Sequence, residues 1–146
     1  MTTCISHSPA ETEYFGETLA ATLRPGDVVA LTGDLAAGKT RFVAGLARGL
    51  GLSDTVTSPT FAIAHEYREG KVPLFHFDMY RLKSSEELYD IGWEDYLRAG
   101  GICAIEWTEN VADAMPRRTV WVDIRILDDT TREFQVTDGR EGEVHV

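Results

Sequence analysis

The chain has 146 residues, of which 43% are hydrophobic and 26% are charged, and its formal net charge at pH 7 is -10. This length and composition predict one folded domain over residues 1–146, and the negative charge disfavours direct binding of tRNA or DNA. The two cysteines, Cys4 and Cys103, fit neither a disulfide framework nor a zinc site, and the chain shows neither a secretion signal nor a membrane span, so we expect a soluble cytoplasmic protein.

Apolar spacing predicts a helix, a strand and a second helix in the first fifty residues. Apolar side chains recur every four positions over residues 11–23, and a Pro-Gly pair then ends this amphipathic helix. A short apolar strand follows at 27–32. Helical spacing returns over 38–50, where glycines again mark the end.

The remainder of the chain predicts mainly strands. A Ser-Pro pair marks a loop, after which the chain alternates between apolar runs, a capped short helix and a final hairpin. The expected elements are a strand starting within 61–64, a strand at 72–77, a helix beginning at 84–87, a strand at 102–107, and an antiparallel pair at 119–127 and 132–137 around the turn 128–130.

A phosphate-binding motif lies between the first strand and the second helix. Residues 33–40 (GDLAAGKT) match the pattern G-x-x-x-x-G-K-[ST], in which glycines let backbone N–H groups approach phosphates, the lysine reaches the β- and γ-phosphates, and the hydroxyl binds Mg²⁺. The residues that supply these groups are Gly33, Gly38, Lys39 and Thr40. The strand and helix on either side favour a working nucleotide site over a simple glycine turn.

Ala36 occupies the fourth position of this loop, where glycine is common because the backbone there tends to positive φ. A residue with a side chain costs about 1–2 kcal/mol in that conformation. We therefore expect weaker nucleotide binding than glycine would give, whereas Ala37 raises no such problem.

Two acids follow predicted strands, as a phosphate loop requires for holding Mg²⁺ and orienting water. Asp78 ends the strand at 72–77, and Glu106 ends the apolar run of the strand at 102–107. Parallel strands that deliver acids beside a phosphate loop predict an α/β fold. We expect a P-loop NTPase-like three-layer sandwich, with a mostly parallel central sheet and a C-terminal antiparallel hairpin.

Three further polar residues lie near this predicted site. Thr60 follows the Ser-Pro pair between the second helix and the Asp78 strand, where switch loops occur, so it is a candidate sensor of the γ-phosphate or metal, with a turn hydroxyl as the alternative. We assign His65 and His76 to strand packing or the surface rather than to general-base chemistry.

In order along the chain, these motifs resemble the bacterial TsaE family, small ATPases of tRNA threonylcarbamoyladenosine (t6A) biosynthesis. The resemblance covers residues 11–132, and the combination HFDxYRL, SPTF and IEW is more specific than the phosphate loop alone. The matching segments are 33–40, SPTF at 58–61, HFDMYRL at 76–82, Glu87-Leu88, Gly92 and IEW at 105–107.

The resemblance implies an Mg²⁺-dependent ATPase that works with the TsaB and TsaD proteins to make t6A at position 37 of tRNAs reading ANN codons, meeting tRNA only indirectly. It implies that residues 36–41 enclose the phosphates of ATP or ADP, that Thr40 and Glu106 bind Mg²⁺, that Asp78 is an acid of the site, and that residues 8–12 lie near the base. With the loop residues above, the expected nucleotide contacts are Thr12, Gly33, Ala36, Ala37, Gly38, Lys39, Thr40, Arg41, Thr60, Asp78 and Arg132, with Lys39, Asp78 and Glu106 catalytic.

Two other functions stay open. A small-molecule kinase would usually carry an arginine-rich lid, but the clustered arginines, Arg117-Arg118, directly precede a strand. A nucleotide-responsive binding module without turnover is close to the family picture. A GTPase is disfavoured because the chain has no N-K-x-D run. Because no clustered arginine marks a built-in finger, we expect slow hydrolysis that partners accelerate, with Arg41 and Arg81 left open as single arginines that could act as a finger.

Overall fold

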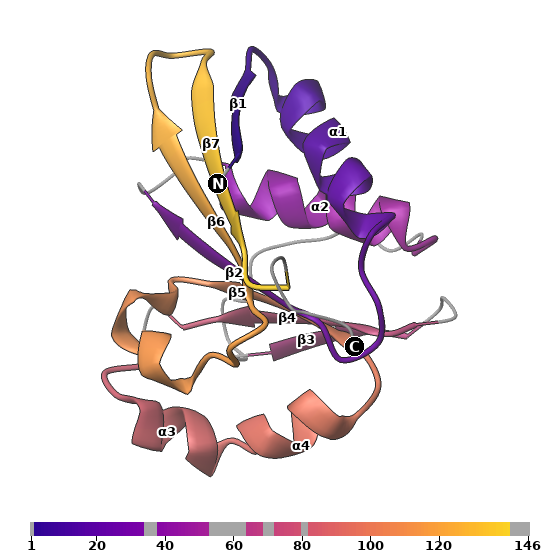
Figure 1. Cartoon of the computed structure of the whole chain (residues 1–146), viewed down its shortest axis with the longest axis vertical. Coiled ribbons are helices and arrows are strands. Elements are labelled where there is room, and N and C mark those ends of the chain that lie inside the picture. Colours follow the sequence, from indigo (N-terminus) through magenta and orange to yellow (C-terminus); the bar gives the residue numbers. More distant parts are fainter. Residues whose placement is uncertain (1, 34–37, 53–63, 69–71, 80–81, 141–146) are drawn as a thin grey trace, which may run out of the picture.

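A computed structural model describes residues 2–33, 38–52, 64–68, 72–79 and 82–140. Within these residues, seven strands form one sheet with helices against both of its faces (Figure 1). The strands are β1 (Thr2–Ser6), β2 (Val28–Gly33), β3 (Ala64–Tyr67), β4 (Leu74–Asp78), β5 (Ile102–Glu106), β6 (Val120–Ile126) and β7 (Arg132–Asp138). The helices are α1 (Pro9–Ala20), α2 (Lys39–Gly49), α3 (Ser85–Asp90) and α4 (Trp93–Arg98), with short 3₁₀ turns η1 (Thr108–Asn110) and η2 (Ala112–Ala114).

The strand order is β1-β7-β6-β2-β5-β4-β3. In the centre, β2 pairs in parallel with both β5 and β6, and β5 pairs in parallel with β4. The outer pairs are antiparallel, including the β6–β7 hairpin. The predicted α/β sandwich with a parallel centre and a C-terminal antiparallel hairpin is therefore confirmed. In this register Glu106 lies opposite Leu31 on one neighbouring strand and Asp78 on the other.

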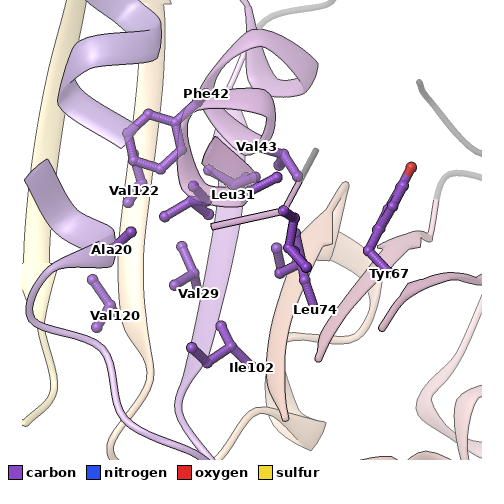
Figure 2. Packing of buried hydrophobic residues seen from close by; sticks show 14 of the residues in the cluster. Ala20, Val29, Leu31, Phe42, Val43, Tyr67, Leu74, Ile102, Val120 and Val122 are labelled. Atoms are coloured by element: carbon purple, nitrogen blue, oxygen red, sulfur yellow. The ribbon is translucent and has the colours of Figure 1, made fainter. Parts of the chain in front are cut away.

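Two hydrophobic layers hold the helices to the sheet. Val29 and Leu31 of β2 pack with Phe42 and Val43 of α2 in the first layer (Figure 2), whereas Val28 belongs to the second layer, beneath α3 and α4. A strand that is buried on both faces needs apolar residues at consecutive positions. This explains why β2 reads as a continuous apolar run in the sequence.

Helices α1 and α2 pack against each other through glycines. A Cβ atom at Gly45 would lie 2.0 Å from the carbonyl oxygen of Glu13, and one at Gly16 would lie 2.3 Å from that of Phe42. No side chain fits at either position, so the two backbones are in direct contact. This contact fixes the first turn of α1 beside the first turn of α2, which follows the phosphate loop.

The structure differs from the sequence prediction at several elements. Strand β1 and helix α4 were not expected. Helix α1 starts earlier than predicted, since the Ser8 hydroxyl accepts from the Glu11 N–H at 3.1 Å and Pro9 occupies the first turn. Ser84 precedes α3 as expected, but its side chain makes no capping hydrogen bond. No helix among the described residues is both long and apolar enough to cross a membrane.

Candidate nucleotide site

The phosphate motif begins and ends on glycines whose backbone excludes other residues. Gly33 has φ 125°, and a Cβ atom there would lie 2.0 Å from the carbonyl oxygen of Ile124. Gly38 has φ 105° and precedes α2, whose N-terminus has no side-chain cap. The first N–H groups of a helix attract anions. Ala36 and Ala37 lie outside the described residues, so the expectation for them stays a prediction.

Lys39 is buried at this helix start. Only 4% of the residue is exposed, and its Nζ donates to the carbonyl oxygen of Gly33 at 3.0 Å. The same nitrogen lies 3.4 Å from the centre of the Trp107 ring. Trp107 has φ 60° and ψ 53°, and it is the one non-glycine residue with positive φ among those described. Strained backbone of this kind is found mainly at functional sites.

Thr40 connects the phosphate motif to β5. Its Oγ1 donates to the two carboxylate oxygens of Glu106, at 3.3 Å and 3.2 Å, and Glu106 is 3% exposed. Within the described residues, no group of three His, Cys, Asp or Glu side chains could hold a metal by itself. A hydroxyl and one carboxylate still fit Mg²⁺ in a phosphate site, because this cation keeps several waters and binds substrate phosphates.

Asp78 lies beside Glu106 at the end of the neighbouring strand β4. The two residues are register partners in a parallel pair, so their side chains point to the same face of the sheet, the face that α2 covers. The Met79 N–H donates to the carbonyl oxygen of Glu106 at 3.0 Å and extends the ladder by one bond. Both acids thus lie at adjacent strand ends, as expected, and their catalytic roles stay predictions.

A cavity of about 490 Å³ opens next to Gly38. This volume is in the range of small-molecule pockets. It lies between the first turn of α1, the start of α2 and the β6–β7 turn, and is lined by His7, Ser8, Pro9, Thr12, Gly38, Arg41, Asp129, Thr130 and Arg132. The structure therefore brings Thr12, Arg41 and Arg132 together beside the phosphate motif, although they are far apart in the sequence.

These lining residues are held in different ways. The Thr12 hydroxyl lies 2.8 Å from Ser6 Oγ, and its methyl carbon faces Gly38. Arg132 Nη1 donates to the carbonyl oxygens of Asp128 and Thr131, at 2.7 Å and 3.1 Å. Arg41 is mostly exposed and lies 3.8 Å from a Glu13 carboxylate oxygen. Thr12 thus presents an apolar surface to the cavity, whereas the two arginines supply positive charge.

His76 lies in strand β4, in agreement with the predicted strand packing, but the sequence analysis missed its contact with Glu106. It is fully buried, and its Nε2 lies 2.5 Å from Glu106 Oε2. Strand alternation could have indicated this, because His76 and Asp78 are two residues apart and share one face of β4. His65, by contrast, contacts the Tyr67 hydroxyl at 3.3 Å, as expected for strand packing. Thr60 lies outside the described residues.

Comparison with known proteins relates the chain to one group. The family model described as "Threonylcarbamoyl adenosine biosynthesis protein TsaE" matches residues 6–134. The TsaE protein of Treponema pallidum is 45% identical over 133 residues, 91% of this chain and 98% of that protein. The TsaE protein of Bacillus subtilis is 40% identical over 130 residues, 89% and 81% of the two chains. A crystal structure of Bacillus subtilis YdiB superposes with a TM-score of 0.81 at 34% identity, covering 94% of this chain and 84% of the other.

Proposed function

The chain belongs to the TsaE family, and we propose that it binds ATP with Mg²⁺ and hydrolyses it slowly in the service of t6A modification of tRNA. The names of the matching relatives support the pathway. The observation that carries the nucleotide site is the contact of Thr40 with Glu106 at the start of α2, one residue after the buried Lys39.

Each described residue of the site has a role that its position supports. Lys39 lies at the α2 N-terminus, where its ammonium would bind the β- and γ-phosphates. Thr40 and Glu106 would hold Mg²⁺, which neutralises phosphate charge when bound. Asp78, adjacent to Glu106, would orient water toward the γ-phosphate. The cavity lined by Thr12 and Arg132 would hold the base and ribose.

We propose that turnover is slow in the isolated protein because three described arginines, Arg41, Arg117 and Arg118, are not placed to act as a finger at the γ-phosphate. Arg41 is 61% exposed and pairs with Glu13. Arg117 and Arg118 precede β6 and line a second cavity with Asp27 and Val28 at the start of β2, so they lie at the opposite end of the parallel strands from Glu106. This placement also argues against a kinase with an arginine lid.

The partners in this proposal are the TsaB and TsaD proteins, and ATP hydrolysis drives a cycle of binding and release rather than the carbamoyl transfer. The modified tRNAs are those reading ANN codons, at position 37, and the acidic chain meets tRNA only through the complex. The alternative is a nucleotide-responsive binding module without significant turnover.

Reconstitution separates these functions. Steady-state phosphate release and t6A formation are measured in reactions that contain purified TsaB and TsaD. Three reactions are compared: one with the wild-type protein, one with Glu106→Ala, and one without this protein. Partner-stimulated release that is lost in Glu106→Ala supports the cycle. Unchanged release with partners, together with t6A formation over many cycles by Glu106→Ala, would refute the coupling. Multiple-turnover t6A formation without phosphate release would favour the binding module.

A further inference from the structure

We propose that His76 is a positioning residue for Glu106. The hydrogen bond from its Nε2 to the Glu106 carboxylate fixes that carboxylate in the orientation that receives Mg²⁺. This inference rests on the proposed function, because it assumes that Glu106 is a magnesium ligand. Its basis is the 2.5 Å separation between His76 Nε2 and Glu106 Oε2, between side chains of two adjacent strands.

Sheet geometry brings the two side chains together. His76 is opposite Ala104 in the β4–β5 register, and Asp78 is opposite Glu106. Leu74 and Ala104 pack in the layer beneath α2, whereas Phe75 and Phe77 pack in the opposite layer. His76 therefore points to the α2 face and reaches Glu106 diagonally across the strand pair.

The hydrogen-bond chemistry indicates which atom donates. Because an ionised carboxylate only accepts hydrogen bonds, we assign the hydrogen to His76 Nε2. Glu106 then receives His76 at Oε2 and Thr40 at both oxygens. Two carboxylate oxygens offer about four lone-pair positions, which leaves places for a cation. If the Thr40 oxygen bound a cation instead, His76 would be the group among the described residues that still holds Oε2.

The second ring nitrogen of His76, Nδ1, indicates that hydrophobic packing alone does not explain why a histidine occupies this position. His76 is 0% exposed, and its Nδ1 has no hydrogen-bond partner within the part of the chain that the structure describes. An unpaired buried polar atom is unfavourable, and an apolar side chain of similar size would fill this position without that cost. Glu106 is the one hydrogen-bond partner of this ring within the same described part.

Two substitutions separate the positioning role from burial. His76→Gln places an amide N–H near the Nε2 position, whereas His76→Asn places it near the Nδ1 position, out of reach of Glu106. His65→Asn is the matched control, because His65 is the β3 register partner of His76 and contacts Tyr67. Each protein is titrated with Mg²⁺ in the presence of N-methylanthraniloyl-ATP, and nucleotide affinity is also measured in EDTA.

For His76→Asn we expect about 10- to 100-fold more Mg²⁺ at half-saturation, the usual effect of losing a hydrogen bond to a metal ligand, with affinity in EDTA unchanged. His76→Gln should recover most of this loss, and His65→Asn should match wild type. Wild-type magnesium dependence in His76→Asn, or equal losses in the Asn and Gln variants, would overturn the inference.

Two further measurements test the metal site separately from His76 and replace the His76→Asn variant if it does not fold. Glu106→Gln must itself weaken the Mg²⁺ response; if it does not, the proposed metal site fails, independently of His76. If urea unfolding shows that His76→Asn does not fold, the ¹⁵N signals of the His76 ring are followed in wild type with bound ATP. They should move when Mg²⁺ is added, and unmoved signals would overturn the inference.

Discussion

The Lys39 ammonium lies 3.4 Å from the centre of the Trp107 ring and 3.0 Å from the carbonyl oxygen of Gly33. The aromatic face and the carbonyl dipole together stabilise a cation that is otherwise buried. A phosphate group at the start of α2 would attract the same ammonium. Nucleotide binding should therefore change the environment of Trp107, which also packs on the hydrophobic layer beneath α3 and α4.

Lys39→Ala should weaken ATP binding by about 10- to 100-fold, because hydrogen bonds to charged groups contribute about 1.5–3 kcal/mol. The fluorescence of Trp107 reports the binding in wild type, and Trp107→Phe identifies its share of the signal from three tryptophans. For the variants themselves, affinity is measured by calorimetry. Unchanged affinity and turnover in Lys39→Ala would remove the phosphate-site assignment.

The two acids should respond differently to magnesium. Glu106→Ala should cut hydrolysis and weaken Mg-ATP more than metal-free ATP, because Glu106 contacts Thr40 at the proposed cation site. Asp78→Ala should reduce turnover with a smaller change in magnesium dependence. Phosphate release measured over a range of Mg²⁺ concentrations compares the two variants. A wild-type magnesium curve in Glu106→Ala would contradict the assignment.

ATP should bind more tightly than GTP, with the base held in the cavity beside Gly38. Arg132→Ala should weaken binding, because Arg132 is anchored at the edge of that cavity by the β6–β7 turn. Arg125→Ala is a suitable control, since Arg125 lies on the same hairpin but pairs with Asp123. Competition between the two nucleotides measures the preference. Equal affinities would mean that only the phosphates are recognised.

Local patterns in the sequence predicted the phosphate motif, the two acids and most central elements, because each of these depends on residues close together in the chain. The cavity could not be derived in this way. It is lined by Thr12, Gly38 and Arg132, and these meet only through the pairing of β1 with β7 and the contact of α1 with α2. The resemblance to the TsaE family indicated Thr12 and Arg132 as nucleotide contacts, but it did not predict how they are arranged around the cavity.

Some elements were missed for reasons that concern tertiary contacts. Strand β1 has few apolar residues because it is an edge strand, and its stability comes from the ladder with β7. The backbone of Trp107 could not be foreseen, because positive φ in a tryptophan reflects its surroundings rather than its own preference. The contact of His76 with Glu106 could not be predicted, because the two residues lie on different strands, β4 and β5.

Gly45→Ala should destabilise the protein, although alanine is the better helix former by about 1 kcal/mol. The added methyl group would overlap the carbonyl oxygen of Glu13, and overpacking of this kind costs about 1–3 kcal/mol. Urea unfolding measures the change in the free energy of unfolding. A stabilised variant would mean that the contact between α1 and α2 is looser than described. The sign of the change in the free energy of unfolding therefore decides whether the α1–α2 contact at Gly45 is as close as described.

Cys103 should resist alkylation in the folded protein. Burial raises the pKa of its thiol to about 12, so the reactive thiolate is scarce in mildly alkaline buffer. The unfolded chain releases this proton at lower pH, so the contribution of Cys103 to stability is lost as pH rises from the usual thiol pKa toward 12. Mass spectrometry after iodoacetamide should show Cys4 modified first and Cys103 only in urea. Equal rates for both would contradict the burial.

The pairing of β1 with β7 also sets an order for the assembly of the molecule. A ribosome delivers Lys39, Thr40, Asp78 and Glu106 well before Arg132, so the phosphate side of the site can form on a nascent chain that still lacks the wall of the cavity. Strand β1 is synthesised before β7, the strand with which it pairs. Until then it has no partner strand, and unpaired strands invite association with other chains. The interval between the synthesis of β1 and that of β7 is therefore the stage at which β1 is most exposed to association with other chains.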